Sequence, residues 1–335
     1  MILNAFTIIM LFIAVLTGVL AIPLGILSFK VYQKWGNVLY DEEKTAIINR
    51  SYLLGLMATV ILFVRLLSWP LFYVALQSYV PDVHGAMCIF GVTRLQPNLT
   101  GIVQVLKPLV FFSIGAWLLL NRLDRATETS PLFRRKFLFL SIVSVMIIMD
   151  STGDLIYLTG FDVKTFVSCC TTYFDLPERP TAVITESLLG EGYDRYMLPL
   201  YYLSGALFIA VQFISYHRMR KGFSHSIKIG IIGFVIAVIN AVITVLSMFE
   251  VIAPEIMNMP LHHCIYCMWQ YSPHSILMTT LFIIGTFSPG WSLILNVTGR
   301  DKETTAVLES YLKNLNILGI AGIGASVLMA TVHLV

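Results

Sequence analysis

Long apolar runs separated by shorter polar stretches dominate the chain. They fall at about 3–29, 51–80, 102–120, 137–160, 196–217, 227–253, 273–297 and 314–335. An α-helix needs about 20 apolar residues to cross roughly 30 Å of hydrocarbon, and these runs match that length. The pattern predicts an all-α fold, a polytopic bundle of about eight transmembrane helices that forms a single membrane domain over residues 1–335.

The composition agrees with a membrane environment. Of 335 residues, 57% are hydrophobic and only 12% are charged, whereas a soluble domain carries roughly 25% charged residues. So few charges could not cover a soluble fold of this size. We therefore expect the lipid bilayer to be the principal partner of the chain, and we expect no nucleic acid partner.

The positive charges are distributed unevenly over the loops between the runs. Four alternate loops, 30–50, 121–136, 218–228 and 298–313, hold 16 of the 22 Lys and Arg residues, and the loops 81–101, 161–195 and 254–272 hold four. Cytoplasmic loops carry the excess of Lys and Arg. The count predicts that both termini are non-cytoplasmic. We expect the membrane to be the cytoplasmic (inner) membrane of a bacterium or an archaeon.

An even number of spans allows a repeat of four plus four, with halves 1–160 and 196–335 joined by the outer loop 161–195. Each half has a similar outer hairpin. His84-Gly-Ala-Met-Cys88 follows the second run, and His262-His-Cys-Ile-Tyr-Cys267 follows the sixth. These two segments favour a parallel internal repeat.

All five cysteines map to the outer loops or to the outer ends of the predicted helices. They are Cys88, Cys169, Cys170, Cys264 and Cys267, and His84, His262, His263 and His274 share their level. Structural disulfides are one explanation, since they are common in oxidising compartments. An odd number of cysteines leaves at least one of them outside such pairs within a single chain.

A redox role is the leading hypothesis. Cys264-Ile-Tyr-Cys267 is a Cys-x-x-Cys pair at the entry to the seventh helix, where a helix N-terminus and nearby histidinium ions lower a thiol pKa. Cys169, Cys170 and Cys88 are the expected exchange partners. The arrangement resembles in outline the mechanism of DsbB and vitamin K epoxide reductase proteins. That resemblance implies a quinone acceptor and a soluble periplasmic thiol partner.

Metal binding is the alternative, and it uses nearly the same residues: His84, Cys88, His262, His263, Cys264 and Cys267. Cysteine and histidine are ligands for zinc and for copper, and a metal-carrying protein would then be the soluble partner. A c-type haem is not expected, because Met268 and not histidine follows Cys267. A third possibility is a disulfide-stapled membrane subunit of a larger complex, so the sequence leaves open whether the chain is an enzyme.

Four charged residues lie inside the predicted spans, where burial is costly. Asp150 and Asp154 are four residues apart and therefore share a helix face. Arg65 is level with Asp150, and Lys107 is level with Asp154. They predict an intramembrane charge network of two ion pairs, which either locks the helices together or delivers protons, and Glu250 is a candidate to join it.

Overall fold

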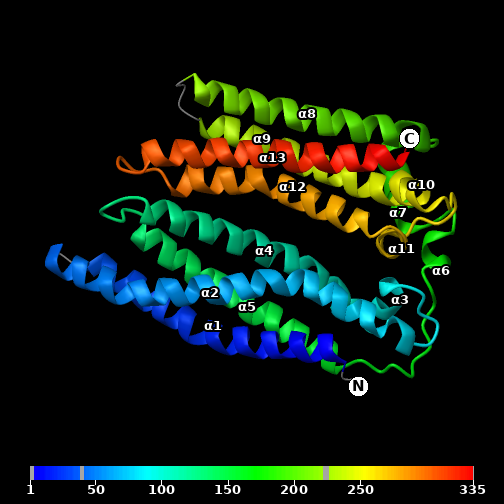
Figure 1. Ribbon diagram of the computed structural model, residues 1–335, viewed down its shortest axis with the longest axis horizontal. Coiled ribbons are helices and arrows are strands. Elements are labelled where there is room, and N and C mark those ends of the chain that lie inside the picture. Colours follow the sequence, from blue (N-terminus) through cyan, green and yellow to red (C-terminus); the bar gives the residue numbers. More distant parts are fainter. Residues whose placement is uncertain (1–3, 38–40, 222–225, 335) are drawn as a thin grey trace. The chain divides into compact units, whose positions relative to one another are not determined.

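A computed structural model describes residues 4–37, 41–221 and 226–334 of the chain (Figure 1). Within these ranges every regular element is helical, and no β-strand occurs. The predicted all-α fold is therefore confirmed. The chain forms two compact units, Met1–Val167 with Asp301–Thr304, and Ser168–Arg300 with Thr305–Val335.

The first unit consists of four long helices and two short turns of helix. The long helices are α1 (Ala5–Asn37), α2 (Asp41–Tyr79), α4 (Pro97–Arg125) and α5 (Phe133–Thr159), and the short ones are η1 (Val80–Asp82) and α3 (Ile89–Thr93). Helix α5 packs against both α1 and α4, and α2 packs against α1. Small residues allow the α1–α5 approach, since a Cβ at Gly18 would lie 3.0 Å from Ser151 Cβ.

The second unit has four long helices, with the short helices gathered at one end of it (Figure 1). The long helices are α8 (Asp194–Arg220), α9 (Ile227–Ser247), α12 (His274–Thr298) and α13 (Thr305–Leu334). Ser226 caps α9, because its Oγ accepts a hydrogen bond from Lys228 N at 3.3 Å. A π-helical turn η2 (Met248–Ile252) and α10 (Ala253–Met257) continue α9, and α6 (Thr171–Phe174), α7 (Pro180–Leu189) and α11 (Ile265–Tyr271) complete the unit.

Eight helices in the described part of the chain are long and apolar enough to cross a membrane, in agreement with the predicted number. Their bounds are Ala5–Gly36, Ala46–Asp82, Pro97–Arg125, Phe133–Thr159, Asp194–Arg220, Ile227–Met257, His274–Thr298 and Val307–Leu334. They carry large apolar side chains on their outer surfaces; Phe12 is 64% exposed, and Leu203 is 67% exposed. So much exposed apolar surface is unfavourable in water and favourable in lipid. The chain is an integral membrane protein.

The apolar pattern did not predict the short helices α3, α6, α7 and α11, which lie outside the eight candidate spans. Three of them begin directly after a cysteine, because Cys88 is the N-cap residue of α3, Cys170 is that of α6 and Cys264 is that of α11. The predicted loops 81–101, 161–195 and 254–272 therefore contain folded elements that position their side chains.

Helices α12 and α13 come close together at two glycines, Gly285 and Gly322. A Cβ at Gly322 would lie 2.8 Å from Gly285 Cα and 2.8 Å from the Leu281 carbonyl oxygen, so backbone atoms would have to move. We expect Gly322→Ala to lower the free energy of unfolding by about 1–3 kcal/mol, the usual cost of overpacking. Gly324→Ala on the same helix is the matched control, because its Cβ would meet only Ile209 Cδ1 at 3.9 Å. Thermal unfolding in detergent measures both; equal midpoints would contradict the prediction.

Candidate functional site

The Cys-x-x-Cys pair lies at the start of α11 in the second unit. Cys264 has an extended backbone (φ −95°, ψ 113°), and Cys267 belongs to the first turn of the helix. Residues three apart in such a turn lie on the same side. Cys264 is fully buried and Cys267 is partly exposed, so this pair places one sulfur inside the protein and one nearer its surface.

Cys170 joins this pair from the segment that leads into α6. Its Sγ lies 3.4 Å from Cys267 Sγ, and the Sγ atoms of Cys170, Cys264 and Cys267 all lie within 4.8 Å of one another. A disulfide bond measures about 2.05 Å, so the 3.4 Å separation of Cys170 and Cys267 is a contact between sulfurs and not a bond. We call Cys170, Cys264 and Cys267 the three-thiol group.

Cys169 is adjacent to this group. Its Sγ lies 3.3 Å from Cys170 Sγ. Cys170 is 1% exposed, whereas Cys169 is partly exposed. Burial raises the pKa of the Cys169 thiol, and its contact with Cys170 raises it further.

His262 is directed toward the three-thiol group, and a carboxylate orients it. Its Nε2 lies 3.8 Å from Cys170 Sγ. Its Nδ1 lies 2.6 Å from Asp175 Oδ1, so an N–H at Nδ1 donates to the carboxylate and leaves the lone pair of Nε2 toward the sulfur. Sequence reasoning missed Asp175. Its position five residues after Cys170 was the available signal.

The neighbouring histidine has a different environment. His263 is buried, and its Nδ1 lies 3.0 Å from the Phe249 carbonyl oxygen. Burial lowers the pKa of His263, and the positive charge of Arg179 lowers it further. Of the two adjacent histidines predicted as ligands, His262 is the one whose ring contacts a thiol.

A second set of contacts holds the segment 168–193 against the π-helical turn. Arg179 Nε donates to Glu250 Oε1 at 3.3 Å, and a second guanidinium nitrogen contacts Glu250 Oε2. Tyr193 Oη donates to the same Oε2 at 2.9 Å, and burial together with this carboxylate raises the pKa of Tyr193. Glu250 therefore pairs with Arg179 within the second unit. A lone carboxylate in an apolar run needs such a counter-charge, and that rule could have indicated the pair.

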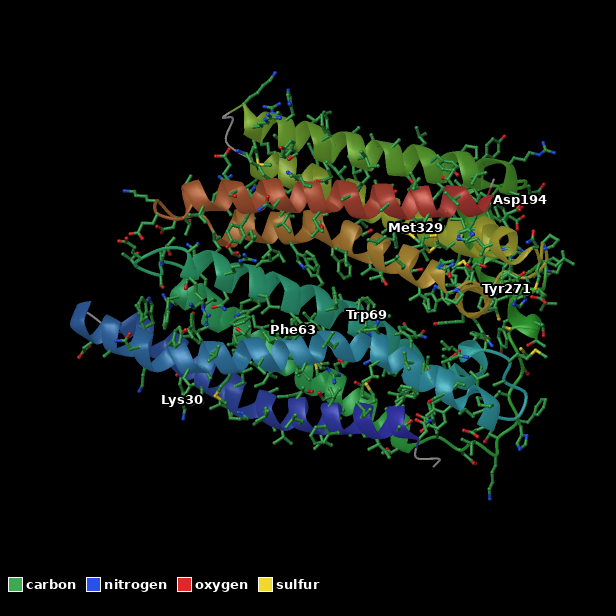
Figure 2. All side chains as sticks on the ribbon, viewed as in Figure 1. Lys30, Phe63, Trp69, Asp194, Tyr271 and Met329 are labelled. Atoms are coloured by element: carbon green, nitrogen blue, oxygen red, sulfur yellow. The ribbon has the colours of Figure 1, made fainter. Side chains whose placement is uncertain are left out.

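Both contact sets lie at the end of the second unit where the short helices gather. Figure 2 labels Asp194 at the start of α8 and Tyr271 at the end of α11, and both residues lie at this end. The segment 168–193 thus has several attachments to the rest of the second unit, through Cys170, through Asp175, and through Arg179 with Tyr193.

The remaining predicted ligands, Cys88 and His84, belong to the first unit. Cys88 is fully buried at the N-cap of α3. His84 is exposed, and its carbonyl oxygen accepts a hydrogen bond from Val167 N at 3.0 Å. Their roles in redox chemistry or metal binding stay predictions.

The four intramembrane charges of the first unit form one network. Arg65 donates to Asp150 Oδ2 from Nε at 2.8 Å and to Asp154 Oδ2 from Nη2 at 2.7 Å. Lys107 Nζ lies 2.6 Å from Asp154 Oδ1 and 3.4 Å from Asp150 Oδ1. The four side chains are at most 3% exposed. Each cation therefore contacts both carboxylates, whereas the sequence suggested two separate pairs.

Comparison with protein-family models, with curated proteins and with solved structures finds no match for this chain. The functional evidence is therefore the geometry of its own side chains. The features that can support chemistry are the three-thiol group with His262 and Asp175 in the second unit, and the charge network in the first.

Proposed function

We propose that this integral membrane protein binds a metal ion, zinc, through Cys170, Cys264, Cys267 and His262. One observation carries the proposal: three buried or partly buried thiols converge within 4.8 Å, and His262 Nε2 lies 3.8 Å from one of them. In a tetrahedral zinc site, with Zn–S near 2.3 Å and Zn–N near 2.0–2.1 Å, neighbouring ligand atoms are about 3.6–3.8 Å apart. The separations of 3.4 and 3.8 Å lie close to this spacing.

The surroundings of the four ligands also suit a cation. A zinc ion would bind the sulfurs as thiolates and release their protons, and its charge would offset the cost of burying thiolates. Asp175 supplies the second contact that ligating histidines ordinarily have, which fixes the ring and its tautomer. Copper(I) is the other ion that such thiolates accept, and it is an outcome of the test below.

We propose the orientation that the cation count favours. The ligands and both termini would then face the non-cytoplasmic side of a bacterial or archaeal cytoplasmic membrane, where a soluble metal-carrying protein could reach them. We also propose a four-plus-four repeat. Its support is that each half places a cysteine at the N-cap of a short helix, Cys88 before α3 and Cys264 before α11.

A thiol–disulfide oxidoreductase is the second candidate function, favoured by the 3.4 Å approach of Cys170 Sγ to Cys267 Sγ. In its oxidised form these two sulfurs would share a disulfide. A partner dithiol would attack it, leave as a disulfide, and reduce Cys170 and Cys267 to thiols. A quinone would then take the two electrons and two protons and become a quinol. His262 would assist as the base next to Cys170.

Elemental analysis of the protein, purified anaerobically in detergent, separates the two candidates. We expect about one zinc ion per chain, lost in Cys264→Ser and in His262→Gln because three ligands of a tetrahedral site hold the ion less tightly. His263→Gln is the matched control and should retain the metal, because His263 Nδ1 lies against the Phe249 carbonyl oxygen. Stoichiometric copper would change the identity of the ion and keep the site. Loss of metal in both histidine variants, or in neither, would contradict the assignment of His262.

A metal-free protein whose thiols oxidise and reduce in a reversible two-electron step would overturn the metal proposal in favour of the oxidoreductase.

Alkylation by a membrane-impermeant maleimide tests the orientation. It is measured on right-side-out vesicles and on inverted vesicles. Labelling of Cys169 from the cytoplasmic side would contradict the proposed topology.

A further inference from the structure

The second unit offers more soft ligands than one tetrahedral ion can take. Cys170, Cys264, Cys267 and His262 already supply the four positions of a structural zinc site. Cys169 is a fifth donor, and its Sγ lies 3.3 Å from the Sγ of Cys170. Cys169 is therefore not needed to bind the ion, and its contact with the ligand Cys170 calls for another explanation.

The exposure of the thiols changes from one side of the group to the other. Cys264 is fully buried and Cys170 is 1% exposed, whereas Cys169 and Cys267 are partly exposed. An ion that arrives from solution on the side of the 168–193 segment would therefore meet the sulfur of Cys169 before that of Cys170. Cys169, which is partly exposed, and Cys170, which is buried, therefore form a short path from the surface to the ligands.

The backbone keeps Cys169 in this position. Thr172 Oγ1 donates to the Cys169 carbonyl oxygen at 2.8 Å, and Phe174 N donates to the Cys170 carbonyl oxygen at 2.8 Å. The contact of Arg179 with Glu250 anchors the same segment a few residues later. Local hydrogen bonds thus hold the partly exposed Cys169 next to the buried Cys170.

We propose that Cys169 is a transfer ligand, through which a thiol-bound zinc ion passes between a soluble carrier and the buried ligands. The proposal rests on the metal site proposed above and makes that site exchangeable. In the inward step a bond from zinc to Cys169 forms as a bond to a carrier thiolate breaks, and the bond to Cys170 then replaces the bond to Cys169. The thiol proton of Cys169 passes to the departing carrier thiolate when Cys169 binds zinc, and the thiol proton of Cys170 passes to Cys169 when Cys170 takes its place on the ion. No electrons are transferred.

Zinc exchange measured on the full-length, zinc-loaded protein in detergent tests this role. Excess zinc-67 is added, and the replacement of bound natural zinc is followed by mass spectrometry at constant occupancy. We expect Cys169→Ser to keep about one zinc per chain and to exchange it at least about tenfold more slowly, an effect of the size that outer partners have on metal sites. Ser168→Ala is the matched control, since Ser168 is the exposed preceding residue and carries no thiol; its exchange rate should equal that of the unsubstituted protein.

The possible outcomes separate this inference from the metal site itself. Exchange in Cys169→Ser at the unsubstituted rate would overturn the transfer role and leave the site intact. Loss of the zinc in Cys169→Ser would also overturn it, because Cys169 would then be a resident ligand. An unsubstituted protein that binds no zinc at equilibrium would overturn the metal proposal, and the transfer role with it.

Discussion

Asp154→Asn is expected to lower the free energy of unfolding by about 3–5 kcal/mol, the cost of leaving a buried charge without its partner. Asp154 accepts from Arg65 Nη2 at 2.7 Å and lies 2.6 Å from Lys107 Nζ. In the variant, the only carboxylate left to Lys107 in this network would be Asp150, at 3.4 Å. Asparagine has nearly the same volume as aspartate, so the change removes charge and creates no cavity. The midpoint of thermal unfolding in detergent should fall by roughly 10 °C.

A second substitution should restore much of this loss. Combining Asp154→Asn with Lys107→Met removes one positive and one negative charge, and Arg65 with Asp150 remains as a neutral pair joined by a 2.8 Å hydrogen bond. Replacing buried ions by apolar groups of similar volume is often neutral or stabilising. Asp162→Asn is the control for Asp154→Asn, because it makes the same change at an exposed loop carboxylate. A double variant no more stable than Asp154→Asn alone would refute the compensation of charge within the network.

Removal of the proposed zinc ion is expected to expose the segment 168–193 to proteolysis. The ion would join Cys170 of this segment to Cys264 and Cys267 at α11, and structural zinc sites contribute about 10–16 kcal/mol in small zinc-binding peptides. Without the ion the segment keeps the Asp175–His262 contact, the Arg179–Glu250 pair and the stacking of Phe174 on Phe249, whose ring centroids are 5.7 Å apart. These contacts are weaker than metal bonds.

Limited chymotrypsin digestion, with and without a zinc chelator, measures this exposure at Tyr173 and Phe174. We expect the chelator to accelerate cleavage there at least about tenfold, because cleavage follows the population of the opened segment. Glu250→Gln should add to the effect of the chelator, since it weakens the Arg179–Glu250 pair, which is another attachment of the segment. Cys264→Ser should be cleaved rapidly with or without chelator. Equal digestion of zinc-loaded and chelator-treated protein would show that no ion ties this segment down.

The eight long helices could be predicted from sequence because their cause is local. A backbone in hydrocarbon must satisfy its hydrogen bonds within its own segment, so a run of about 20 apolar residues is sufficient evidence for a spanning helix. The short helices α3, α6, α7 and α11 lie outside the candidate spans, where no such rule applies. Their formation depends on contacts with the ends of other helices, and no periodic pattern in their sequence revealed them.

The charge network was partly predictable. The i, i+4 spacing of Asp150 and Asp154 places both carboxylates on one helix face, and their depth in the spans indicated Arg65 and Lys107 as partners. The spacing could not show that each cation reaches both carboxylates. That depends on how α2 and α4 are rotated about their axes, which packing decides.

By itself, the sequence determined that this chain lies in a membrane, that it has about eight helices, and that its cysteines and several histidines fall in the loops of one set. These follow from hydropathy and from position along the chain. Only the tertiary structure decided that Cys170, Cys264 and Cys267 meet, that His262 and not its neighbour His263 contacts a thiol, and that Asp175 orients it. The physical reason is that these contacts join segments about 90 residues apart, and the directions of adjacent side chains there follow from loop backbone that no helical or strand period describes.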